Sequence, residues 1–243
     1  MYFSLLPTNL TMYFLPIITT VMAFIFFAIL VKDYLRRSHT LYMLWLAIGL
    51  AAYGASAFAE SIHALNGYHA ANFKLWYISG ALVGGWSLVT GMLYLILPKK
   101  TADILMLTGL AYIAVVSIYC ILSPTGEIPD GNRLSGTAFD WDFIRPMTML
   151  IHLISFILLT GAAFFSAFQF SKSSSFKNRF FGILIVSAGG LMPGLGRSHN
   201  DIGISSSFYL LELLSLFFIF SGCLMLKNEK QTAVKEFHAK INS

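Results

Sequence analysis

The sequence predicts an all-α membrane protein: a polytopic bundle of seven transmembrane helices with its amino terminus outside and its carboxyl terminus inside. Seven long apolar stretches divide the chain, and the charged residues fall between them or close to one rim. Hydrophobic residues make up 57% of the chain and charged residues only 11%, whereas a soluble domain carries about 25% charged residues. We therefore expect a multi-pass protein of the cell membrane, with the lipid bilayer as its partner.

The predicted spans are long enough to cross the bilayer, which requires about 20 helical residues for a hydrocarbon core about 30 Å thick. The fifth span is long and must tilt or project. The sixth is short because a Gly-Pro run at 189–196 undermines its far end. We expect this helix to end early into an outer loop; the alternative is a broken or kinked helix of the kind that marks substrate sites in transporters. The spans cover residues 12–31, 41–64, 75–97, 102–122, 143–170, 180–195 and 204–226.

Basic residues set the predicted orientation. If the first connection is cytoplasmic, twelve of the 16 Lys and Arg residues lie on that side and four on the other, as the positive-inside rule requires. The twelve are Lys32, Arg36, Arg37, Lys99, Lys100, Lys172, Lys177, Arg179, Lys227, Lys230, Lys235 and Lys240; the four are Lys74, Arg133, Arg145 and Arg197. Residues 1–226 then form the transmembrane domain. Residues 227–243 form a short cytoplasmic tail, either an interfacial helix or a loose solvated segment.

The net charge of +5 is explained by cytoplasmic Lys and Arg that face anionic lipid headgroups. No soluble domain is predicted that could carry a basic patch, so we expect no nucleic-acid partner. Cys120 and Cys223 are predicted near opposite ends of the bundle, which excludes an intramolecular disulfide by reach.

Three ionisable residues inside spans are functional candidates, because such residues are costly in lipid. Glu60 lies about one turn below the outer end of its helix, and His152 and Glu212 lie about two turns below theirs. The inner half of the bundle has no comparable group. These depths predict an outward-facing polar pocket that binds a ligand or an ion. Its candidate residues are Glu60, His63, Arg145, His152, Arg197, His199 and Glu212.

The pairing within this layer stays open at the level of sequence. His152 and Glu212 can pair across the bundle, which would keep the carboxylate charged at low cost. Alternatively, Glu212 meets Arg197 or Arg145 in a structural ion pair. Ligand or ion binding and proton relay are the other roles that we consider.

Glu60 and His63 have the Glu-x-x-His spacing that supplies metal ligands in di-iron bundles. Those sites need two such motifs and two further glutamates, and only one motif is present here. We expect an ordinary polar helix end and leave a metal site unassigned. No catalytic residue and no cofactor are predicted.

Small residues in the third span predict close helix packing. Gly80 and Gly84 form a Gly-x-x-x-Gly pair, which lets two helix backbones approach. We expect this contact inside the bundle; a homodimer formed through the third span is the alternative.

The residues of the predicted seventh span argue against membership in two families that also have seven membrane spans. Microbial rhodopsins hold retinal on a Lys in this span, and residues 204–226 contain no Lys. Seven-span hydrolases related to ceramidases carry paired His ligands there, and this span has none. Haem is not expected either, because apart from His152 the histidines lie at or beyond helix ends.

Three segments carry a closer resemblance: LWYISGAL at 75–82, TGMLYL at 90–95 and YLLELL at 209–214. In these the chain resembles an uncharacterised group of small prokaryotic seven-span membrane proteins. The resemblance implies the fold and topology but no chemistry. More loosely, the chain resembles the seven-span input modules of histidine kinases, with no kinase domain in this sequence.

The absence of a nucleotide motif and of a complete catalytic set in the sequence favours a non-enzymatic protein. The leading hypothesis is a sensor or binding protein with an outward-facing polar pocket, or an integral subunit of a larger membrane complex. A small-molecule or ion transporter is the alternative, and a membrane-embedded metal-dependent hydrolase is the second alternative.

The predicted orientation can be tested by cysteine labelling from outside intact cells. A membrane-impermeant thiol reagent should reach Ser135→Cys, because residue 135 lies in an outer connection, and should miss Ser243→Cys in the tail. Labelling of Ser243→Cys alone would reverse the orientation.

Overall fold

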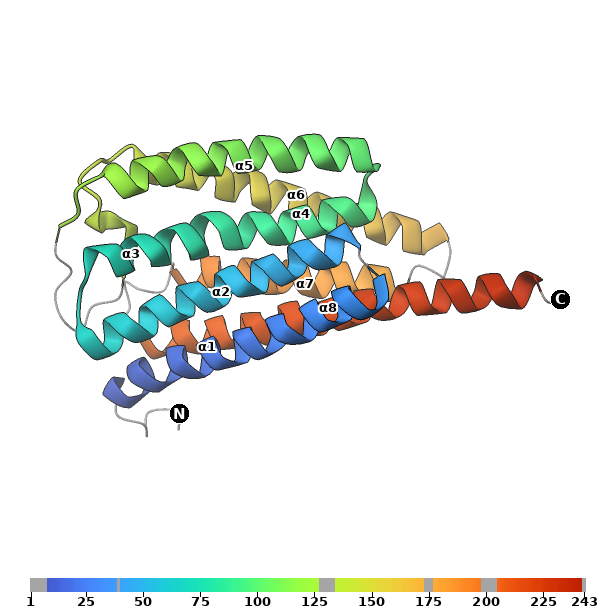
Figure 1. Cartoon of the computed structure of the whole chain (residues 1–243), viewed down its shortest axis with the longest axis horizontal. Coiled ribbons are helices and arrows are strands. Elements are labelled where there is room, and N and C mark those ends of the chain that lie inside the picture. The colour runs from blue at the N-terminus through green and yellow to red at the C-terminus, as the bar shows by residue number, and fades with distance from the viewer. Residues whose placement is uncertain (1–7, 39, 127–133, 173–176, 198–204, 242–243) are drawn as a thin grey trace.

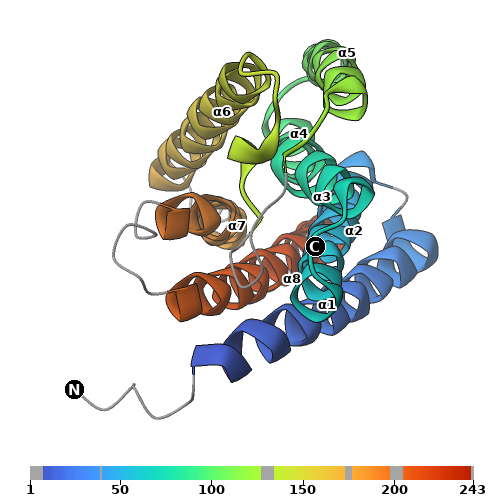
Figure 2. The same ribbon diagram turned by 90° about the vertical axis from the view of Figure 1, so that its left-hand side faces the viewer.

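A computed structural model describes residues 8–38, 40–126, 134–172, 177–197 and 205–241. Helices make up nearly all of these residues and lie side by side in one bundle (Figures 1 and 2). Within the described part of the chain, the single β feature is an isolated bridge between Thr125 and Phe139. The prediction of an all-α protein is therefore confirmed.

The helices form seven rods, because α3, the π-helical segment after it and α4 run on as one helix from Ala70 to Ile96. The elements in order are α1 (Thr8–Asp33), a π-helical turn (Tyr34–Ser38), α2 (Leu41–Asn66), α3 (Ala70–Trp76), the π-helical segment (Tyr77–Gly84), α4 (Gly85–Ile96), α5 (Lys99–Leu122), a 3₁₀ turn (Gly136–Ala138), α6 (Ile144–Lys172), α7 (Lys177–Arg197) and α8 (Ser205–Ile241). We call the helix from Ala70 to Ile96 the third rod.

Six of the rods are long and apolar enough to cross a membrane. A helix suits the lipid environment because its backbone N–H and C=O groups bond to one another within the helix. The remaining rod, α7, has a shorter apolar stretch, Asn178–Met192, among its residues with described side chains. The length and composition of the helices make this a multi-pass membrane protein. The six long stretches are Phe14–Arg36, Leu41–Asn66, Ala70–Ile96, Lys99–Leu122, Ile144–Phe168 and Tyr209–Lys227.

The expectation that the sixth predicted span ends early is wrong, because α7 continues unbroken past Pro193 to Arg197. Proline has no backbone N–H and leaves the carbonyl four residues earlier, here that of Gly189, without its helical partner. The Ser215 hydroxyl on α8 donates to this carbonyl at 2.7 Å. A side chain from the neighbouring helix thus supplies the hydrogen bond that the proline removes.

Glycines let α7 and α8 approach closely enough for this bond. A Cβ atom on Gly189 would lie 2.9 Å from the carbonyl oxygen of Ser215, and one on Gly222 would lie 2.7 Å from that of Gly182. Both distances are too short for a side chain, so the two backbones are in direct contact.

The Gly-x-x-x-Gly pair of the third rod is used inside the bundle, as expected. A Cβ atom on Gly80 would lie 2.3 Å from the Ser56 hydroxyl oxygen of α2, and one on Gly84 would lie 3.9 Å from the Cβ atom of Ala52. The third rod therefore packs closely on α2 through these glycines.

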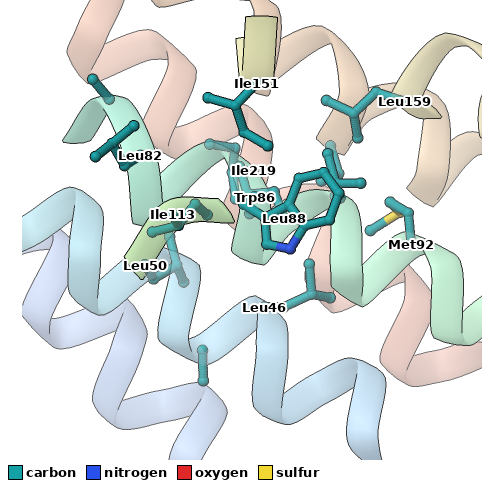
Figure 3. Packing of buried hydrophobic residues seen from close by; sticks show 14 of the residues in the cluster. Leu46, Leu50, Leu82, Trp86, Leu88, Met92, Ile113, Ile151, Leu159 and Ile219 are labelled. Atoms are coloured by element: carbon teal, nitrogen blue, oxygen red, sulfur yellow. The ribbon is translucent and has the colours of Figure 1, made fainter. Parts of the chain in front are cut away.

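Part of the apolar core surrounds Trp86 (Figure 3). Side chains from five rods meet there. Those labelled in Figure 3 are Leu46, Leu50, Leu82, Trp86, Leu88, Met92, Ile113, Ile151, Leu159 and Ile219.

The described parts of the connection between α5 and α6 cover one end of the bundle. Phe139 is 4% exposed, and its ring centroid lies 4.8 Å from that of Phe73 and 4.9 Å from that of Tyr77. Aromatic contacts of this kind anchor the connection on the third rod.

The last helix is longer than the predicted seventh span. α8 runs without a break from Ser205 through residue 226 to Ile241, and its final turns project beyond the other rods (Figure 1). The segment predicted as a separate tail thus continues the backbone of α8.

A double-mutant cycle tests how α7 tolerates its proline. Ser215→Ala should lower the free energy of unfolding by about 1–3 kcal/mol, because the Gly189 carbonyl loses its donor in a buried site. In a Pro193→Ala background the new backbone N–H can serve this carbonyl, so the same change should cost less than about 1 kcal/mol. Unfolding in detergent measures both values. An equal cost in the two backgrounds would contradict the assignment.

Candidate functional site

The first predicted carboxylate, Glu60, faces the bundle interior. It lies on α2 with a relative exposure of 3%, and its Oε1 atom accepts a hydrogen bond from the Trp76 indole Nε1 at 2.8 Å. Trp76 belongs to α3, so this bond joins α2 to the amino-terminal part of the third rod. A hydrogen bond to this carboxylate satisfies one acceptor of a buried polar side chain.

The second carboxylate, Glu212, lies on α8 and is 6% exposed. The Tyr53 hydroxyl on α2 donates to the Glu212 backbone carbonyl at 2.6 Å. Tyr53 lies on the same helix as Glu60, so this bond links the helix that carries one acid to the main chain of the other.

The local reason for this arrangement is helical spacing. Tyr53 precedes Glu60 by seven residues, which is close to two turns, so the two side chains share one face of α2. Ala57 lies between them on this face and is fully buried. This small residue leaves room for the tyrosine and glutamate side chains on either side of it.

Contacts between α1 and α8 show which residues of the two helices lie at the same level. Asp33 forms an ion pair with Lys227, and the rings of Phe26 and Phe220 stack with centroids 3.8 Å apart. Both pairs have the same sequence offset of 194, so α1 and α8 run parallel in one register. Thr19 then lies level with residue 213, which follows Glu212 along α8.

The Thr19 hydroxyl is buried, with a relative exposure of 1%, and has no hydrogen-bond partner among the described residues. The neighbouring Thr20 hydroxyl lies 3.4 Å from that of Ser61 on α2. Together these groups extend the polar contact between α1 and α2.

Two of the three predicted histidines belong to the described residues, and they occupy different places. His63 is buried on α2, three residues beyond Glu60 and close to the carboxyl-terminal end of the helix. His152 is half-buried on α6, and its Nε2 atom lies 2.6 Å from the carbonyl oxygen of Ala81 in the π-helical segment. His152 thus contacts the third rod from α6, whereas the two acids belong to α2 and α8.

The remaining predicted residues contribute less to the described site. Arg145 is exposed near the start of α6. Arg197 ends α7, and its side chain lies outside the described residues, as does His199. The described site therefore comprises Glu60 and Tyr53 from α2, Trp76 from α3, Glu212 and Ser215 from α8, and Thr19 from α1. We call this set the outer polar cluster.

Four members of the outer polar cluster were missed by sequence reasoning: Tyr53, Trp76, Thr19 and Ser215. Tyr53 and Trp76 read as ordinary core aromatics in an apolar helix, and Thr19 as an isolated hydroxyl. The seven-residue spacing between Tyr53 and Glu60 was the signal that could have identified the tyrosine. Trp76 carried no comparable signal, because its contact with α2 depends on how two helices pack.

The chemistry of the outer polar cluster is dominated by acceptors. An ionised carboxylate has about four acceptor positions, so Glu60 and Glu212 can each serve a protein partner and a ligand together. The Tyr53 and Ser215 hydroxyls donate to backbone carbonyls, which leaves their oxygens as further acceptors. Within the described residues, no group of three or more His, Cys, Asp or Glu side chains could hold a metal ion.

Comparisons with protein-family models, with curated proteins and with solved structures find no match. The class of the protein therefore follows from its helices: it is a helical integral membrane protein with six long apolar helices.

The contribution of Tyr53 can be measured by removing its hydroxyl. Tyr53→Phe should lower the free energy of unfolding by about 0.5–1.5 kcal/mol, because the hydrogen bond to Glu212 is lost. Tyr119→Phe is the matched control, since Tyr119 is an exposed tyrosine of α5 whose ring packs on Trp141 and Phe143. Thermal unfolding of the purified protein provides the measurement. Equal effects of the two changes would remove Tyr53 from the cluster.

Proposed function

We propose that this chain is a non-enzymatic membrane protein that binds a small cation, or the cationic group of a larger molecule, in the outer polar cluster. It would act as a sensor or binding protein, or as an integral subunit of a larger complex. The observation that carries this proposal is that two buried carboxylates lie on helices joined by Tyr53, which shares one face of α2 with Glu60 and donates to the backbone carbonyl of Glu212.

The acceptors support a cationic ligand on electrostatic grounds. Two carboxylates near one another attract a cation more strongly than either one does by itself, and this attraction grows in a medium of low dielectric constant. An anion would meet repulsion from both groups. The neutral oxygens of Tyr53 and Thr19 can add ligands without adding charge.

The proposal includes seven spans, with α7 as the sixth in chain order. In Figure 1 the rods alternate in direction, so the first and last rods end at the same side of the bundle. That side carries Lys32 at the end of α1, Lys99 at the start of α5 and Lys177 at the start of α7. The positive-inside rule then supports a cytoplasmic carboxyl-terminal tail at residues 227–243, a transmembrane domain at 1–226 and location in the cell membrane.

The outer polar cluster then faces the outside half of the bilayer. Glu60 lies six residues from the end of α2, which is about 9 Å along the helix. The likeness to small prokaryotic seven-span proteins belongs to the same proposal, and its segments at 75–82 and 209–214 include Trp76 and Glu212.

Cation-dependent stability tests this function. The protein in lipid nanodiscs is heated in chloride salts of Na⁺, K⁺, Mg²⁺, Ca²⁺ and choline at matched ionic strength. A bound cation at 100 times its dissociation constant should stabilise the fold by about 2.7 kcal/mol. Glu60→Gln and Glu212→Gln should each abolish this stabilisation, because each change removes one negative charge from the cluster.

Asp140→Asn is the matched control, since Asp140 is an exposed carboxylate in the outer connection. It should leave the stabilisation unchanged. A melting temperature that no cation shifts, or a shift that survives in both glutamine variants, would refute the proposal. In that case Glu60 and Glu212 would hold the helices together as structural groups.

A further inference from the structure

The third rod contacts α2 at four successive levels, and the residues that it uses are spaced by four. On α2 the spacing is shorter at one step. Across these levels the third rod advances by twelve residues, whereas α2 advances by only eleven. The contacts join Trp76 to Glu60, Gly80 to Ser56, Gly84 to Ala52 and Leu88 to Gly49.

An ordinary α-helix could not keep the four residues of the third rod on one face. Twelve residues turn by about 1200° at about 100° per residue, which is about 120° more than three full turns. Eleven residues turn by about 1100°, within about 20° of three turns. The π-helical segment Tyr77–Gly84 lies inside this stretch, and one extra residue taken up by its wider spacing removes most of the mismatch. The segment thus keeps Trp76 on the face that meets Glu60.

The return to α-helical spacing at Gly85 affects one backbone carbonyl. In π-helical spacing an N–H bonds to the carbonyl five residues earlier, and in α-helical spacing to the carbonyl four residues earlier. Where the first spacing gives way to the second, successive N–H groups pass over one carbonyl. Ala81 lies four residues before Gly85, at this change of spacing. Its carbonyl oxygen is the atom that lies 2.6 Å from Nε2 of His152.

The bond from His152 favours the π-helical form of the segment. A carbonyl oxygen can only accept, so Nε2 of His152 carries the hydrogen and donates it. Ala81 is buried, with a relative exposure of 5%, and a buried carbonyl left without a donor costs about 1–3 kcal/mol. In an α-helical form the N–H of Gly85 would serve this carbonyl, and the bond from α6 would not be needed. His152 therefore stabilises the π-helical form relative to the α-helical one.

We propose that His152 is a positioning residue for the cation site: it holds the third rod in the π-helical form and thereby keeps Trp76 bonded to Glu60. A return of the segment to α-helical spacing would turn Trp76 by about 100° relative to α4. Glu60 would then lose the donor that fixes its carboxylate. Where it concerns cations, this inference rests on the proposed function. The link between His152 and Trp76 stands on the helix geometry and can be tested separately.

The indole N–H signal of Trp76 tests this link without any cation. The protein is labelled with ¹⁵N-tryptophan and reconstituted into nanodiscs, and the signal is assigned by its loss in Trp76→Phe. Glu60→Gln shows where the signal lies when the charged acceptor is removed. In His152→Leu, which lacks a donor, the Trp76 signal should move away from its wild-type position by a comparable amount. His152→Gln keeps an N–H donor and should leave the signal near its wild-type position.

The cation-dependent shift in melting temperature provides the second measurement. His152→Leu should weaken the apparent cation affinity about tenfold, as expected when one hydrogen bond that orients the carboxylate is lost, and His152→Gln should restore it. Tyr112→Phe is the matched control, because the Tyr112 hydroxyl of α5 donates to the Met147 carbonyl of α6 at 2.8 Å. It also removes a bond between α6 and a neighbouring helix, but it should change neither the Trp76 signal nor the cation affinity.

The two measurements separate the outcomes. A Trp76 signal that stays in place in His152→Leu would overturn the inference and leave His152 as a structural contact between α6 and the third rod. A signal that moves while the cation affinity stays the same would also overturn the role at the cation site. If no cation stabilises the wild-type protein, the proposed function fails, and the Trp76 signal still decides whether His152 positions the indole. If His152→Leu fails to fold, His152→Met replaces it, because methionine is flexible and also lacks a donor.

Discussion

Backbone carbonyls in the bilayer must find hydrogen-bond donors, and this requirement explains most of the polar contacts between the helices. Where Pro193 removes a donor from α7, Ser215 provides one to the Gly189 carbonyl. His152 lies against the carbonyl of Ala81 within the π-helical segment, where the helical hydrogen-bond pattern changes. The polar side chains thus hold neighbouring helices in register while they satisfy the backbone.

The same requirement gives the outer polar cluster a dual character. Tyr53 and Ser215 donate their hydrogens to main-chain oxygens and present acceptors on their other side. A group that is needed for packing therefore also forms part of a surface suited to cations. Glu60 and Glu212 supply the charge, and Trp76 fixes the orientation of Glu60. Under the proposed function, structural and binding roles are combined in one set of side chains.

Sequence patterns predicted the helices well because hydropathy is a property of each helix separately. The fourth predicted span, 102–122, corresponds to α5, which begins three residues earlier at Lys99. The predicted early end of α7 was wrong, because the hydrogen-bond donor for the Gly189 carbonyl, Ser215, lies on another helix. The depths of Glu60 and Glu212 were accessible from span boundaries. Tyr53 was not recognised, because only the packing of α2 against α8 gives its hydroxyl a partner.

The unbroken course of α8 has a mechanical consequence. Glu212 and residue 241 belong to one helix without a joint, and the 29 residues between them span about 44 Å. Near the middle of this stretch, Lys227 is tied to Asp33 of α1. A stiff rod held at such a point behaves as a lever. A tilt that moves Glu212 in one direction swings the projecting end in the opposite direction, and the displacement at the two ends is comparable because the arms are of similar length.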